Sequence, residues 1–134
     1  MPGFDIRDRD GKGSLSIAFD GTDEWPVVLS GPGLTARHRV YAYRPHGGFD
    51  RMFKEMAAAW RGWEGEKVWR SLEGELRLVC THDGLGRVTI VVGLQMDFPA
   101  EWSAEVTLLV EPGQLDALAK AAADFLDDEA PFGS

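Results

Sequence analysis

Apolar residues alternate with polar or small ones along two neighbouring stretches in the second half of the chain. The first stretch places Leu76, Leu78 and Cys80 at alternate positions, and the second does the same at every other position over residues 88–98. A period of two residues is typical of a β-strand that buries one face. The connection over residues 82–86 contains an Asp-Gly pair, which is a strong turn signal. These residues therefore predict an antiparallel hairpin with one buried face.

The same alternation recurs in shorter stretches on both sides of this hairpin. It predicts strands around residues 4–6, 15–19, 25–29, 34–43 and 102–110. Two other stretches change to a helical period. Apolar residues recur at intervals of three and four over residues 49–60 and 115–126, so each stretch predicts a helix with one buried stripe.

The order of these elements is ββββ-α-βββ-α, with short turns that favour antiparallel pairing. We therefore predict an α+β fold in a single domain over residues 1–128. Its twisted, largely antiparallel sheet has about six to seven strands, and both helices cover one face. Residues 129–134 are expected to be a disordered acidic tail.

A chain of 134 residues can bury a sufficient core without a metal or disulfide. Cys80 is the only cysteine, so no internal disulfide can form and a reducing cytoplasm is the expected location. The first residues lack the pattern of a signal peptide, and no apolar run reaches about 18 residues. We expect a cytoplasmic protein with no membrane association.

The net charge of −8 is unevenly distributed along the chain. Residues 1–96 contain 13 acidic and 13 basic side chains, whereas residues 97–134 contain 9 acidic side chains and Lys120 alone. An acidic surface repels phosphate backbones, so we expect no nucleic-acid partner. A basic protein partner is allowed, although acidic surfaces also serve solubility alone.

Three of the five tryptophans lie within ten residues, and residues 60–74 read WRGWEGEKVWRSLEG. This motif resembles a family of small bacterial proteins that is catalogued as a domain of unknown function. The likeness extends through the strands to the last helix. The resemblance implies a stand-alone domain and contributes no catalytic residue.

The three tryptophans of this motif differ in their expected surroundings. Trp60 continues the apolar stripe of the first helix, so we expect it in the core. Trp63 and Trp69 lie beyond the helix in a loop, where they either pack over the sheet edge or form an exposed recognition surface. If the loop folds back on the sheet, its apolar anchors are Val68, Trp69 and Leu72.

The sequence offers no coherent catalytic set. Cys80 continues the apolar register of its strand, so a small buried side chain explains it better than a metal site with His82 does. The pair His82–Asp83 fits a turn without chemistry. Glutamates at 64, 66, 73 and 75 could pair for glycosidic hydrolysis, but solvated charges or partners for Lys67 and Arg70 explain them better. We expect no cofactor and no metal.

The leading functional hypothesis is a non-enzymatic protein-interaction module, for example an immunity-type inhibitor that occludes a partner's active surface. The alternative is a small-molecule-binding protein or enzyme with a pocket between the sheet and the Trp63–Trp69 loop. Aromatic and arginine side chains on a rigid sheet suit recognition. The candidate binding residues are Trp63, Trp69, Arg70, Arg37, Arg39, Tyr41 and Arg77, of which Arg37, Arg39, Tyr41 and Arg77 are expected to share the solvent face of the sheet.

Overall fold

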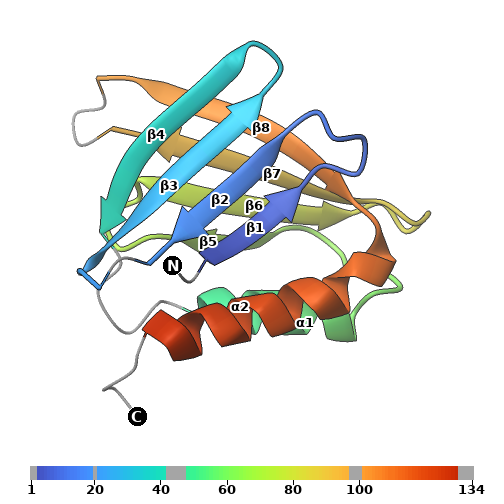
Figure 1. The fold of residues 1–134 in the computed structure, drawn as a ribbon. Helices are drawn as coiled ribbons and strands as arrows, with labels where there is room; N and C mark the ends of the chain where they lie inside the picture. The colour runs from blue at the N-terminus through green and yellow to red at the C-terminus, as the bar shows by residue number, and fades with distance from the viewer. Residues whose placement is uncertain (1–2, 20, 42–47, 97–100, 130–134) are drawn as a thin grey trace.

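The computed structural model describes residues 3–19, 21–41, 48–96 and 101–129. Within these ranges the chain forms eight strands, two α-helices and one short 3₁₀ helix (Figure 1). In chain order they are β1 (Gly3–Arg7), β2 (Ser14–Ala18), β3 (Glu24–Gly31), β4 (Leu34–Tyr41), α1 (Phe49–Ala58), β5 (Lys67–Arg70), β6 (Leu76–His82), β7 (Val88–Gln95), β8 (Ser103–Val110), η1 (Pro112–Gln114) and α2 (Leu115–Glu129). Neither α-helix is long and apolar enough to cross a bilayer.

The strands form two separate antiparallel sheets of four strands each. The N-terminal sheet has the order β1-β2-β3-β4, and the C-terminal sheet has the order β5-β6-β7-β8. Each strand pairs with its neighbour in the chain, because the short turns bring consecutive strands together. A helix follows each sheet, so the chain repeats the order ββββα twice.

The predicted α+β class and antiparallel pairing are confirmed, but the single sheet of six to seven strands becomes two sheets with eight strands. The additional strand is β5, which has four residues and only one buried side chain. Such a short stretch shows no readable alternation in the sequence. Two sheets form because each has one apolar face, and both faces are buried when the sheets pack against each other. The predicted tail lies almost entirely outside the described residues.

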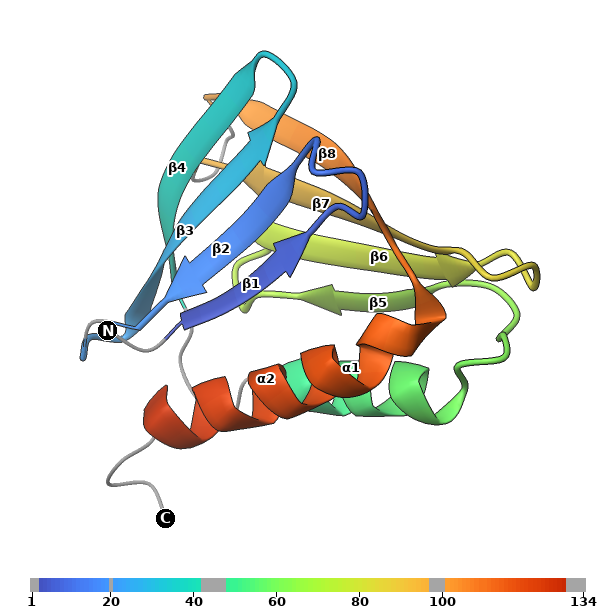
Figure 2. The ribbon, with the colours of Figure 1, turned by 45° about the vertical axis from the view of Figure 1, so that its right-hand side comes forward.

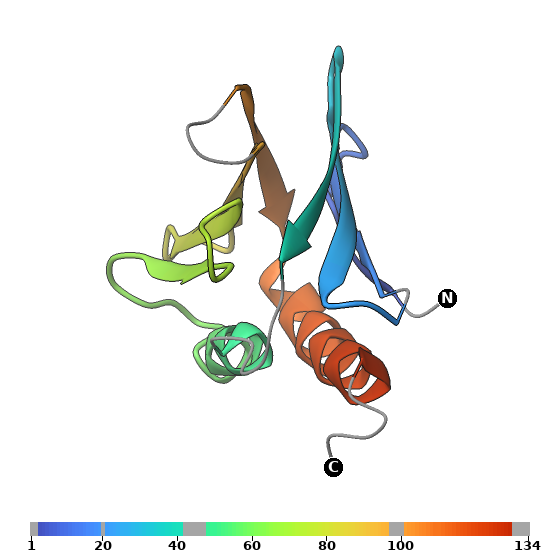
Figure 3. The same cartoon turned by 90° about the vertical axis from the view of Figure 1, so that its left-hand side faces the viewer.

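The two sheets stand on either side of a wedge, and the helices close its broad end (Figures 2 and 3). Helix α1 lies against β5, and helix α2 lies against β1. The helices also pack along each other. The apolar stripe predicted for the first helix is confirmed, since Phe49, Met52, Phe53 and Met56 are all buried. Each sheet therefore has an inner face in the core and an outer face exposed to solvent.

Aromatic side chains from all parts of the fold meet in the centre of this core. The indole of Trp69 on β5 stacks on Trp25 of β3, with 6.2 Å between ring centroids. Phe49 of α1 meets Trp69 edge-on at 4.9 Å, and Phe125 of α2 meets Trp25 at 5.0 Å. Phe4 of β1 completes the cluster against Phe49 at 5.2 Å. The cluster therefore ties both sheets to both helices.

The predicted position of Trp60 is wrong. Helix α1 ends at Ala58, and the backbone of Ala59 leaves the helical conformation. Trp60 therefore no longer follows the helical stripe, and 52% of its surface is exposed. Of the three apolar residues proposed to anchor the loop, Trp69 is buried, whereas Val68 and Leu72 are 47% and 70% exposed.

Two buried carboxylates connect the sheets, and each accepts a backbone N–H from an edge strand of the other sheet. Asp8 follows β1, and its Oδ1 accepts the backbone N–H of Leu109 on β8 at 2.8 Å. Its Oδ2 accepts the N–H groups of Asp10 and Lys12, so the same side chain also shapes the β1–β2 turn. These N–H groups stabilise the charged form and lower the pKa of Asp8, with the Leu109 hydrogen bond as the largest contribution; partial burial opposes the shift.

Glu75 makes the matching connection from the C-terminal sheet. This residue precedes β6, and its Oε1 accepts the backbone N–H of Tyr41 on β4 at 3.0 Å. Its Oε2 lies 2.9 Å from Nε2 of His38, which points inward from the same strand. Glu75 is only 7% exposed, so both carboxylate oxygens are used inside the protein.

Candidate functional site

The arginines and tyrosine predicted to share one solvent face lie on two different faces. Arg37, Arg39 and Tyr41 are on β4, at the outer edge of the N-terminal sheet, whereas Arg77 is on β6 of the C-terminal sheet. The expectation of a common face fails because it assumed a single sheet. Arg39 is also engaged locally, since its Nε lies 3.1 Å from Oε1 of Glu24 on the neighbouring strand.

The tryptophans of the motif have different surroundings. Trp69 lies in the aromatic core with 5% of its surface exposed, so its indole is not part of an outer face. Trp63 is half-buried, and its Nε1 donates a hydrogen bond to the carbonyl oxygen of Cys80 at 3.4 Å. The ring of Trp63 meets His82 edge-on at 5.2 Å, and the ammonium of Lys67 lies 5.7 Å from its centroid. Trp63 therefore attaches the loop after α1 to β6.

A tight hairpin brings Arg70 and Arg77 together on the outer face of the C-terminal sheet. Ser71 starts the turn between β5 and β6, where its Oγ accepts the N–H of Leu76 at 3.1 Å and its N–H donates to the carbonyl of Leu76 at 2.9 Å. Gly74 has a φ of 76°, a left-handed conformation that favours glycine. The resulting register places Arg70 directly opposite Arg77.

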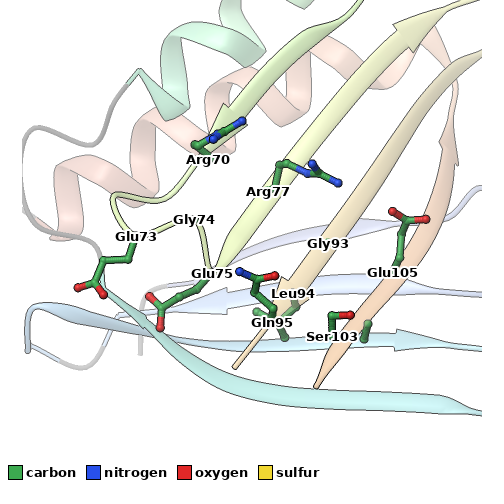
Figure 4. A pocket seen from close by; sticks show the side chains of 11 residues that line it. Arg70, Glu73, Gly74, Glu75, Arg77, Gly93, Leu94, Gln95, Ser103 and Glu105 are labelled. Atoms are coloured by element: carbon green, nitrogen blue, oxygen red, sulfur yellow. The ribbon is translucent and has the colours of Figure 1, made fainter. Parts of the chain in front are cut away.

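This pair continues into a row of residues that crosses the whole sheet. Arg77 is opposite Gly93 on β7, and Gly93 is opposite Glu105 on β8. Because Gly93 has no side chain, the row has a gap between the arginine pair and Glu105. A hollow of about 620 Å³ lies here, as Figure 4 shows. Its lining consists of Arg70, Glu73, Gly74, Glu75, Arg77, Gly93, Leu94, Gln95, Ser103, Ala104 and Glu105.

The charges around the hollow are not paired with one another. In the described part of the chain, no ion pair or hydrogen bond engages the guanidinium of Arg70 or Arg77. Glu75 is turned inward to His38 and Tyr41. Glu105 is two strands away from Arg77, a spacing of roughly 9–10 Å between backbones. The hollow therefore has a positive side at β5 and β6 and a negative side at β8.

An apolar row runs beside the charged one. Val68 on β5 is opposite Val79 on β6, and Val79 is opposite Val91 on β7. All three side chains point outward, because Trp69 next to Val68 is buried and both strand neighbours of Val79 and of Val91 are buried. Val68 is 47% exposed. The outer face of the C-terminal sheet thus combines an apolar row with a charged row.

A second, smaller hollow lies on the outer face of the N-terminal sheet. Its volume is about 340 Å³. Two basic residues, Arg7 and Lys12, lie at its edge, and three serines contribute hydroxyl groups. The serines are Ser14, Ser16 and Ser30. No apolar row accompanies this hollow, since the register places Ser14 between Arg7 and Ser30.

The residues that suggested catalysis have structural roles. Cys80 is fully buried, and this burial raises the pKa of its thiol to about 12. His82 uses both ring nitrogens: Nδ1 accepts the N–H of Gly84 at 2.8 Å, and Nε2 lies 2.9 Å from the carbonyl oxygen of Trp60. Asp83 accepts the N–H groups of Leu85 and Arg87, as expected for a turn. Within the described ranges, no group of three or more metal-binding side chains is found.

Sequence reasoning identified Arg70 and Arg77 as binding residues and named Glu73 and Glu75 only as candidate catalytic carboxylates, but it missed the part of the hollow that comes from β7 and β8. Gly93, Gln95, Ser103 and Glu105 come from β7 and β8, and only the register brings them beside the arginines. One signal was available. Gly93 interrupts the strongest strand pattern in the chain at an outward position, and glycine inside a strand is typical of a site where another group approaches closely.

The family described as "Family of unknown function (DUF6228)" matches residues 16–129. The solved "Structure of the plant transcriptional regulator PBF-2" is similar in fold at a TM-score of 0.47, with 15% sequence identity over 98% of this chain and 83% of that chain. No curated protein matches the chain.

Proposed function

Because the chain belongs to the DUF6228 family of unknown function, we propose a function from its geometry: it is a non-enzymatic protein-interaction module that binds a partner protein with the outer face of the C-terminal sheet. The observation that supports this proposal most directly is the apolar row Val68–Val79–Val91. This row lies next to Arg70 and Arg77, whose guanidinium groups form no ion pair or hydrogen bond with the described residues. Interfaces commonly combine a dehydrated apolar centre with arginine at its side.

The sheet provides a rigid base for this row. β6 and β7 are each hydrogen-bonded on both sides, and their inner faces are fully packed against the core. Binding a partner there does not require ordering of the sheet, so little conformational entropy is lost. A module of this kind acts by covering a surface of its partner, as an immunity-type inhibitor does.

A matched pair of variants tests this proposal. Val79→Glu places a charge in the apolar row, whereas Val28→Glu makes the same change on the outer face of the N-terminal sheet. Both valines are half-buried and lie on inner strands. Quantitative mass spectrometry of proteins captured from native lysate should show a partner that is retained by the wild type and by Val28→Glu and lost by Val79→Glu.

The outcome that contradicts the proposal is equally specific. If every captured protein is retained by Val79→Glu while thermal melts show that all variants are folded, this face does not bind a partner.

The second candidate function is that of a small-molecule-binding protein or enzyme. The volume of the larger hollow supports it, since sites for small ligands span about 300–1000 Å³. This alternative was predicted to have its pocket between the sheet and the Trp63–Trp69 loop. Trp69 is instead buried in the core, and the hollow lies on the outer face of the C-terminal sheet beside Arg70. Native mass spectrometry that finds a co-purifying ligand, lost in Gly93→Leu, would favour this function over the first.

A further inference from the structure

We propose that the Arg70–Arg77 pair is a receptor for carboxylate groups, and that it binds a short acidic segment of the partner protein. This inference rests on the proposed function for the existence of a partner. It adds the chemistry by which the face selects that partner.

The first argument is the energetic cost of the pair itself. Arg70 and Arg77 lie directly opposite each other on adjacent antiparallel strands. Like charges in that position are destabilising. In the described part of the chain no carboxylate offsets the repulsion by pairing with either guanidinium. An anion from outside the chain would relieve it, because a carboxylate can accept two parallel hydrogen bonds from one guanidinium.

The second argument is the space beside the pair. Gly93 leaves the position next to Arg77 without a side chain, and the nearest side-chain atom to a Cβ built there would be Nε of Arg77, at 4.0 Å. The hollow of about 620 Å³ is therefore open directly beside the guanidinium. In Figure 4 the side chain of Arg77 extends from β6 toward β7, where Gly93 carries no side chain.

The third argument concerns the size of the anion. Glu73 lies in the turn at one end of the hollow, and Glu105 lies beyond Gly93 at the other. Both repel a long polyanion that extends past the arginines. Glu75 adds little to this repulsion at the surface, since its carboxylate is turned inward to Tyr41 and His38. One or two carboxylates fit between the flanking glutamates, whereas a nucleic-acid backbone carries a phosphate at every step.

The test is a nuclear magnetic resonance titration of the full, isotope-labelled chain at low salt. The probe is the blocked peptide acetyl-Gly-Glu-Glu-Gly-amide, and its Gln-Gln counterpart is the matched neutral ligand. We expect the acidic peptide to shift the amide signal of Gly93 and the neutral one to leave it unchanged. Arg77→Gln and Arg70→Gln should each weaken the peptide about tenfold or more, since hydrogen bonds to charged groups are strong.

Three controls separate a binding role from a general charge effect. Arg37→Gln removes an exposed arginine from the outer face of the N-terminal sheet and should leave the affinity unchanged. Arg77→Lys keeps the charge but loses the planar fork, so it should bind more weakly than the wild type and more tightly than Arg77→Gln. Glu105→Gln removes the repulsion at β8 and should tighten the peptide several-fold.

The proposal is overturned if the acidic peptide binds equally to the wild type and to the folded Arg70→Gln and Arg77→Gln variants. It is also overturned if a single-stranded oligonucleotide or inorganic phosphate shifts Gly93 at lower concentration than the peptide does. Loss of a captured partner in Val79→Glu with no effect of the peptide would leave the protein-interaction function standing without the carboxylate site. Peptide binding with no captured partner would leave the carboxylate site standing without the protein-interaction function.

Discussion

Trp60 and Trp69 show how strongly the position of a single residue depends on where the neighbouring element ends. Trp60 is the fifth apolar residue of a helical pattern, but the helix stops two residues before it and its indole is half in solvent. Trp69 has no clear pattern around it, and yet it lies in the centre of the aromatic core. Helix ends depend on local backbone geometry, which periodicity does not record.

Replacing these two tryptophans should therefore have very different effects on stability. Trp69→Ala removes contacts to Trp25 of the other sheet and to Phe49 of α1, and it should lower the free energy of unfolding by about 3–5 kcal/mol. Trp60→Ala removes an exposed side chain and should change it by less than about 1 kcal/mol. Urea unfolding followed by circular dichroism measures both. Equal free energies of unfolding for Trp69→Ala and the wild type would contradict the role assigned to Trp69.

The elements with long, regular patterns were predictable from the sequence, and short or irregular ones were not. The hairpin of β6 and β7 and the stripe of α1 have the predicted buried positions, because each repeats one period over at least two turns or several alternate residues. β5 is too short to show a period. The division into two sheets could not be predicted. Alternation indicates that a strand buries one face, but it does not indicate to which sheet the strand belongs or what packs against the buried face.

Strand β6 allows a direct test of the predicted register. Leu78 and Cys80 are both fully buried, but leucine fills more of the core. Leu78→Ala should cost about 2–5 kcal/mol, and Cys80→Ala should cost less. Because burial raises the pKa of the Cys80 thiol to about 12, a thiol reagent should label the native protein at neutral pH only as fast as the protein opens. Rapid labelling of the folded chain would show that this face of β6 is accessible.

For the whole molecule, Asp8 and Glu75 add buried polar connections between two sheets whose inner faces are joined by apolar packing. The pKa of Asp8 is lowered in the folded state. Its contribution to stability is therefore fully present above the pKa of an unfolded aspartate, about 3.9, and is lost as the pH falls through the lower folded value. The sequence positions of Asp8 and Glu75 do not indicate that these residues connect the sheets, because the partner of each lies in the other sheet.

Asp8→Ala should lower the free energy of unfolding at neutral pH by about 2–3 kcal/mol, because the N–H groups of Leu109, Asp10 and Lys12 lose a charged acceptor. The difference between variant and wild type should shrink as the pH falls below the pKa of an unfolded aspartate, about 3.9, and through the lower folded value, because the wild-type carboxylate then also becomes protonated. Chemical denaturation at a series of pH values measures this difference. A difference that stays constant down to acid pH would show that the charge of Asp8 is not what matters.

The two carboxylates also bear on how the chain behaves at high concentration. Leu109 and Tyr41 lie on β8 and β4, which are edge strands, and their N–H groups on the unpaired side are taken up by Asp8 and Glu75. An open edge strand is a template on which another copy can add a strand, and this is a common route to aggregation and domain swapping. Each sheet thus protects one edge of the other against self-association, so a chain that has lost either carboxylate should form aggregates before it loses its secondary structure.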